Sequence, residues 1–100
     1  MRSKIDVKEM LRKLENNPEE FANIKELGSK VLIIYALSQM GVKELLRMER
    51  FIKWLEKNDR EMLVIALILM DTKKKAELLS HEGFVKVFSS LIEKLKGYVF

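Results

Sequence analysis

Residues 62 to 70 read MLVIALILM, nine consecutive residues without a polar side chain. At helical pitch, such a segment forms a helix that is apolar on every side. A second run, VLIIYAL at residues 31 to 37, is nearly as apolar. A chain of 100 residues therefore has two helices that should be buried on every side. We expect either that both lie at the centre of a compact bundle, or that one of them faces a partner chain.

Helix start signals occur throughout the chain, whereas no stretch alternates apolar and polar residues between turn signals as a strand does. Three pairs have the spacing of a capping box: Asp6 with Glu9, Asn17 with Glu20, and Asn58 with Glu61. The sequence predicts an all-α fold, a compact bundle of about six or seven short helices with one or two fully buried central helices. The length fits one helical domain over residues 1–100.

Glycine and serine residues set the expected helix boundaries. Gly28 and Ser29 are expected to end one helix and to cap the next, which stops at Gly41 in a left-handed terminator. Beyond Gly41, we expect one long amphipathic helix over residues 42–57. Ser80 is expected to cap a last helix that continues to about residue 96.

The composition is typical of a protein from the reducing interior of a cell or from an organism that grows at high temperature. The chain has no cysteine, which excludes disulfides, thiolate nucleophiles and cysteine-ligated zinc. Charged residues make up 34% of the chain, with little Asp, one Gln and one Thr, as in hyperthermophile proteins. Residues 1–10 lack the apolar core of a signal peptide, and neither apolar run approaches the roughly 20 residues of a membrane span. We expect a thermophilic, cytoplasmic protein without membrane contact.

The residue types that usually carry catalysis are scarce. His81 is the only histidine, so a two-histidine metal site is excluded in a monomer, and its position suits a solvated first helical turn. Asp6, Asp59 and Asp71 lie at expected helix starts, where capping explains them. No Gly-rich loop is present to hold a nucleotide. We expect no enzyme activity, and hence no catalytic residue, metal, cofactor or small-molecule substrate.

The strongest functional pattern lies on the expected helix over residues 42–57. Five residues share the side opposite its apolar stripe: Lys43, Arg47, Arg50, Trp54 and Lys57. Such a row of cations can follow a phosphate backbone, and an indole among them can stack on a base. The alternative is that Trp54 packs against another helix and the cations surround that contact. Exposure of the Trp54 ring separates the two, because stacking needs an accessible ring.

Two further segments contain candidate binding residues. Lys73, Lys74 and Lys75 lie where a helix should begin, and the helix dipole disfavours positive charge there. Phosphate or an acidic partner would offset that cost, and a solvated turn is the alternative. At the C-terminal end, Tyr98 and Phe100 are expected either to fold back onto the last helix or to insert into a partner.

Residues 27–45, LGSKVLIIYALSQMGVKEL, resemble the opening of archaeal winged-helix regulators, in which a buried helix ends in glycine before a short second helix. The resemblance covers about a fifth of the chain and implies a helix-turn-helix regulator, although one expected helix and no wing strands follow. In size, helical content and basic charge, the chain is also similar to the small helical subunits of archaeal CRISPR effector complexes. That similarity implies help in nucleic-acid binding without catalysis.

These patterns predict a non-catalytic helical accessory or adaptor protein that forms a homo-oligomer or joins a larger complex. The basic row around Trp54 makes nucleic acid the expected ligand, and the net charge of +4 is compatible with a phosphate-rich partner. One alternative is a purely structural protein-protein interaction module. Another is a divergent helix-turn-helix DNA-binding regulator, which a break in the expected helix near residues 47–49 would favour.

Overall fold

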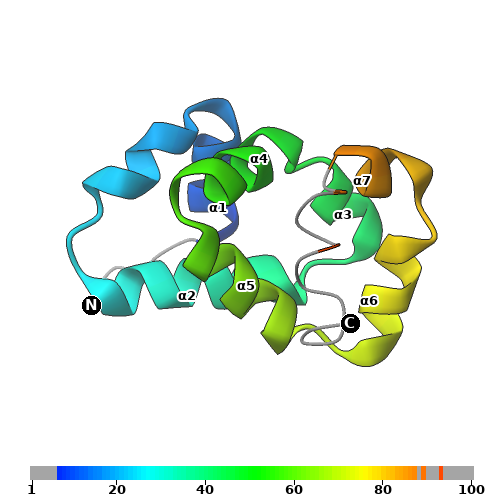
Figure 1. Ribbon diagram of the computed structural model, residues 1–100. Helices are drawn as coiled ribbons and strands as arrows, with labels where there is room; N and C mark the ends of the chain where they lie inside the picture. Colours follow the sequence, from blue (N-terminus) through cyan, green and yellow to red (C-terminus); the bar gives the residue numbers. More distant parts are fainter. Residues whose placement is uncertain (1–6, 88, 90–92, 94–100) are drawn as a thin grey trace.

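Helices account for all the regular structure among the described residues of the computed structural model, which are residues 7–87, 89 and 93 (Figure 1). The α-helices are α1 (Val7–Asn16), α2 (Leu27–Gln39), α3 (Val42–Leu46), α4 (Glu49–Asn58), α5 (Arg60–Leu69), α6 (Thr72–Leu79) and α7 (Glu82–Val87), and η1 (Pro18–Asn23) is a 3-10 helix. The expected all-α bundle is confirmed. In these described ranges, no helix combines the length and the apolarity that crossing a membrane requires.

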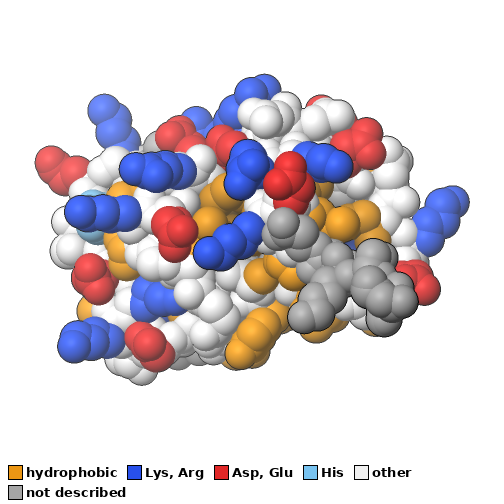
Figure 2. Space-filling view, turned by 180° about the vertical axis from the view of Figure 1, so that it is seen from behind, with side chains coloured by type: hydrophobic (Ala, Val, Ile, Leu, Met, Phe, Trp, Pro, Cys, Tyr) orange, Lys and Arg blue, Asp and Glu red, His pale blue; other side chains and the backbone are white. Residues whose placement is uncertain are grey.

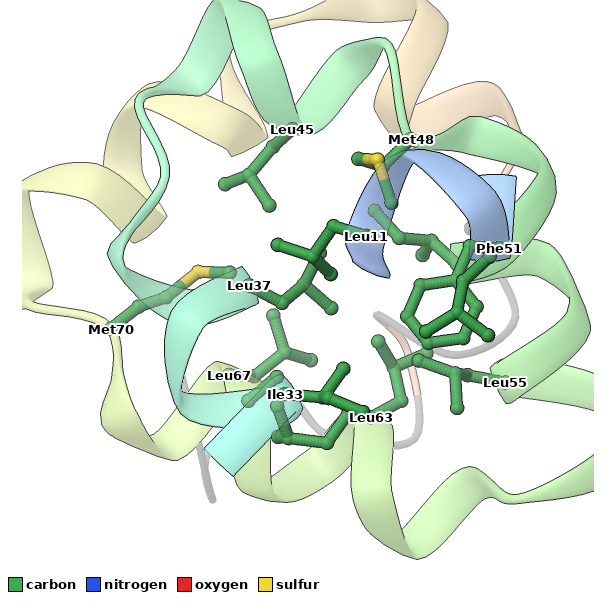
Figure 3. Close-up of a cluster of buried hydrophobic side chains, with 14 of the residues drawn as sticks. Leu11, Ile33, Leu37, Leu45, Met48, Phe51, Leu55, Leu63, Leu67 and Met70 are labelled. Carbon is green, nitrogen blue, oxygen red and sulfur yellow. The ribbon is translucent and has the colours of Figure 1, made fainter. Parts of the chain in front are cut away.

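Buried side chains from most of these helices meet in one core (Figure 3). Leu11 of α1, Leu37 of α2, Phe51 of α4 and Leu67 of α5 are all buried there. Each side chain of this size contributes about 1.5–3 kcal/mol when it leaves water. The core therefore joins helices that lie far apart in the sequence.

The two most apolar helices, α2 and α5, pack against each other, and Ala66 of α5 is fully buried. Neither helix is enclosed on all sides. Tyr35 of α2 is 51% exposed and Ile68 of α5 is 59% exposed. The prediction of one or two fully buried central helices is therefore wrong. A chain of this length has too few other helices to cover both of them all round.

The expected boundary at Gly28 is wrong, whereas α2 does end just before Gly41 but without the expected left-handed turn. Gly28 lies inside α2, which takes Glu26 as its N-cap residue. Gly41 has φ −68° and ψ 162°, an extended conformation, and serves as the N-cap of α3. Its amide donates to the Glu44 carboxylate at 3.2 Å, which is the contact that a capping box makes at a helix start. Gly41 therefore begins a helix, and no left-handed turn is needed there.

Of the two caps predicted at the ends of α6, the one at Asp71 is confirmed and the one at Ser80 is wrong. The Asp71 carboxylate accepts from the Lys74 amide at 2.7 Å, as the capping prediction for Asp71 required. The Ser80 hydroxyl instead donates back to the Glu77 carbonyl at 2.7 Å. Ser80 thus ends α6, and α7 begins at Glu82. The expected end of the last helix near residue 96 lies outside the described residues.

Candidate functional site

The expected single helix over residues 42–57 is two helices, α3 and α4, separated by a turn at Arg47 and Met48. Met48 has φ −96° and ψ 29°, outside the helical region. Its amide donates to the Leu45 carbonyl at 2.9 Å, a tight bond that closes α3. The turn allows the Met48 side chain to lie in the core. The basic row of residues therefore stands on two short helices, and the break lies where the helix-turn-helix alternative expects one.

A carboxylate from α1 caps the start of α4. Glu15 accepts from the Phe51 amide at 3.1 Å and from the Arg50 amide at 3.3 Å. The first amides of a helix lack intrahelical acceptors, and the positive end of the helix dipole favours an anion beside them. Because Glu15 already supplies this anion, the start of α4 is not an open site for a phosphate group.

The Trp54 ring is half-buried in an aromatic cluster with Phe21 and Phe51. Its centroid lies 6.1 Å from that of Phe21, with the ring planes at 74°. Phe21 also meets Phe51 edge to face at 5.5 Å, and the Lys30 ammonium lies 5.3 Å from the Phe21 centroid. Contacts of this geometry stabilise packed aromatic rings. The indole thus has a structural role, which is the alternative expected for a tryptophan that packs against another helix.

The four cations of the expected row remain on the surface. Lys43, Arg47, Arg50 and Lys57 are exposed, and none of them forms an ion pair with another described residue. Two are on or directly after α3, and two are on α4. The structure therefore keeps the positive charges accessible but separates them from an accessible aromatic ring.

The lysines at the start of α6 have different roles. The Lys74 ammonium donates to the Ser38 carbonyl at 2.7 Å, near the C-terminal end of α2. A cation is favourable at that end of a helix, where carbonyl groups lack intrahelical donors. Lys73 is exposed and Lys75 is half-buried. The cost of three cations at a helix start is thus offset within the chain, by the Asp71 cap and the end of α2.

The outward side of α2 is the most unusual surface in the described part of the chain. Six residues of α2 are exposed, and none is charged: Leu27, Gly28, Val31, Leu32, Tyr35 and Gln39. We name these six residues the α2 surface. Seen from behind, hydrophobic side chains reach the surface in the lower middle of the molecule, the part in which α2 and α5 pack together (Figure 2).

Helices α1 and α4 differ sharply from α2 in their exposed residues. Four of the five exposed residues of α1 are charged, and the same holds for α4. Such charged faces are the usual outer sides of surface helices. Leu27 in the α2 surface is 65% exposed, and the exposed Ile68 and Leu69 lie on α5, the helix that packs on α2.

Sequence reasoning identified α2 as apolar but not which of its residues face outward. One signal was present, since residues 31–42 contain no charged side chain. A helix whose outer side faced water would carry charges in this range. Of the residues expected to bind a partner, Tyr98 and Phe100 lie outside the described residues.

A groove of about 310 Å³ opens between α3, α4 and the start of α7. It is lined by Leu45, Leu46, Glu49, Ile52, His81, Gly83 and Phe84. The Glu49 carboxylate at its edge is paired with Lys53 at 2.9 Å. His81 is half-buried in this lining, so it is less solvated than the sequence predicted.

Comparison with known proteins found no matching family model, no similar curated protein and no similar solved structure.

Proposed function

We propose that this chain is a non-catalytic protein-protein interaction module that binds another apolar protein surface through the α2 surface. The observation that carries this proposal is the lack of charge among the exposed residues of α2, whereas the exposed residues of α1 and α4 are mostly charged. Contiguous apolar surface of this kind marks interaction sites, and the cores of interfaces are depleted in charge. The cysteine-free composition supports the cytoplasm as its compartment.

A photo-crosslinking amino acid in place of Leu32 is expected to give discrete protein adducts in the cells that naturally contain the chain. Leu32 lies in the α2 surface, so a bound protein would stand within reach of the probe. The control carries the same probe at Ala76, an exposed position of α6. Adducts should be identified by mass spectrometry, with and without the change Gly28→Glu in the same chain.

The proposal requires adducts that depend on the probe position and disappear with Gly28→Glu. An added Cβ at Gly28 meets nothing within 4 Å, so this change places a charge on the surface without a steric conflict in the fold. Equal adducts from Leu32 and Ala76 would argue against a site on α2. Adducts to nucleic acid instead of protein would contradict the proposed function.

Nucleic-acid binding is the second candidate, favoured by the exposed, unpaired cations on α3, α4 and the turn between them among the described residues. The helix-turn-helix form of this candidate has the required break, but α3 has only 5 residues and Glu15 occupies the start of α4. A phosphate-backbone contact by Arg47 and Arg50 needs neither a recognition helix nor stacking by Trp54.

The double change Arg47→Glu/Arg50→Glu is expected to weaken binding to DNA or RNA at low salt by about tenfold or more, because two phosphate contacts are lost. The Trp54 fluorescence should not respond to nucleic acid, since its ring packs against Phe21. Titrations by fluorescence anisotropy measure both effects. Lys8→Glu/Lys13→Glu on α1 is the matched control, because it changes the net charge equally. An equal loss in the control would contradict a specific contact at Arg47 and Arg50.

A further inference from the structure

We infer that the partner of the α2 surface is a second copy of this chain, with the two α2 helices packed antiparallel across a twofold axis at Val31. This inference rests on the proposed function, because it names the protein that the interaction module binds. Twofold dimers are the commonest assemblies of identical chains, and they pair one patch with itself.

The charge distribution favours a second copy over other partners. Each chain has a net charge of +4, and a nucleic acid or an acidic peptide would contact its cations. The α2 surface holds no charged residue with which to attract such a partner. Two positively charged chains can meet at this neutral surface without placing like charges in direct contact.

The spacing of the apolar residues makes the surface complementary to itself. Leu27, Val31 and Tyr35 follow one another at four-residue intervals, so they form a row along the outward side of α2. An antiparallel copy with its axis at Val31 places Leu27 opposite Tyr35 of the second copy. Gly28, beside Leu27, has open space where a Cβ would lie, which leaves room for the larger tyrosine ring.

The ends of α2 favour the antiparallel orientation. Lys25 and Glu26 precede the helix, whereas its last turns contain no charge. A parallel pair would place Lys25 beside Lys25 of the second copy, and Glu26 beside Glu26. An antiparallel pair places both residues against the uncharged end of the other helix, and the two helix dipoles then oppose each other favourably.

A dimer interface of ordinary size would include the α2 surface and the apolar residues around it. A stable interface buries about 800 Å² on each partner, or about an eighth of the 6720 Å² that this chain exposes. Helix α2 has 13 residues and is about 20 Å long. The exposed Ile68 and Leu69 on the adjoining α5 add apolar area near this helix.

Single cysteines test the geometry, because the chain contains no native cysteine. Val31→Cys is expected to form an intermolecular disulfide readily under mild oxidation, since the axis brings two copies of this position together. Leu27→Cys alone should not, because the two copies would lie about 12 Å apart along the helices, beyond disulfide reach. A mixture of Leu27→Cys and Tyr35→Cys chains should again couple, and Ala76→Cys is the control for random collision.

Light scattering of the purified chain tests the partner itself. The expected molar mass is twice the 11.8 kDa of one chain. Gly28→Glu should reduce it to the mass of one chain, whereas the matched control Ala76→Glu should leave it unchanged. Circular dichroism of Gly28→Glu should show a retained helical fold, since an acid near the start of α2 suits the helix dipole.

Each other result overturns a defined part of the inference. If the molar mass is that of one chain at every concentration, the partner is not a second copy. Crosslinking of Leu32 to a different protein would then still support the proposed function. A dimer in which Leu27→Cys couples with itself removes the antiparallel arrangement. A dimer that persists in Gly28→Glu places the interface away from α2.

Discussion

Replacing Phe51 with alanine is expected to lower the free energy of unfolding by about 3–5 kcal/mol. The Phe51 ring is fully buried, and its edge-to-face contact with Phe21 lies at a centroid distance of 5.5 Å. The change removes the transfer free energy of a phenyl ring and leaves a cavity between α1, α4 and η1 that the surrounding helices only partly fill. Urea denaturation followed by circular dichroism measures the loss.

Two further variants keep this prediction testable if Phe51→Ala does not fold. Phe51→Leu retains most of the buried volume and should cost clearly less than Phe51→Ala. Lys53→Ala, on the same helix but exposed, should change the free energy of unfolding by no more than about 0.5–1 kcal/mol. A Phe51→Ala variant that folds and loses no more stability than Lys53→Ala would contradict the burial of Phe51 at the centre of the core.

Replacing Glu15 with alanine is expected to lower the free energy of unfolding by about 1–3 kcal/mol. The Glu15 carboxylate accepts from the amides of Arg50 and Phe51, and without it these donors at the start of α4 lack an acceptor. The loss should exceed that of an ordinary surface change, because a charged acceptor and the helix dipole act together. Thermal and urea unfolding report it.

The amide Glu15→Gln separates the two contributions. It keeps an oxygen acceptor but removes the charge. Its free energy of unfolding should therefore fall between that of the wild type and that of Glu15→Ala. Glu19→Ala, an exposed acid of η1, serves as the control and should have little effect. Equal stability of Glu15→Ala and Glu19→Ala would show that the contact does not hold α4 in solution.

Local signals in the sequence were enough to predict the fold class. Asp71 caps α6 as expected, and the apolar run at residues 62–70 is a helix that supplies core residues. The break at Met48 could not be predicted in this way, because no glycine or proline marks it. It depends on a core position for the Met48 side chain and on the distant Glu15 carboxylate, and both exist only after the helices have packed.

The candidate site was less predictable than the fold. Helical spacing correctly placed Arg47 and Arg50 at the surface, but it also placed Trp54 beside them as an accessible ring. The partner of that ring is Phe21, which is 33 positions earlier in the chain, and no local pattern links the two. Likewise, the uncharged run at residues 31–42 indicates that the outward side of α2 lacks charge, but which residues face outward depends on the packing.

The contact of Glu15 with the start of α4 also bears on the order in which the chain acquires structure. A helix as short as α4, with 10 residues, is marginal by itself, and its start is completed by a residue 35 positions earlier. Helix α1 has the same length, so we expect neither helix to be stable before the two pack against each other. Helix α4 then docks as it folds, and the ring of Phe51 is withdrawn from water in the same cooperative step.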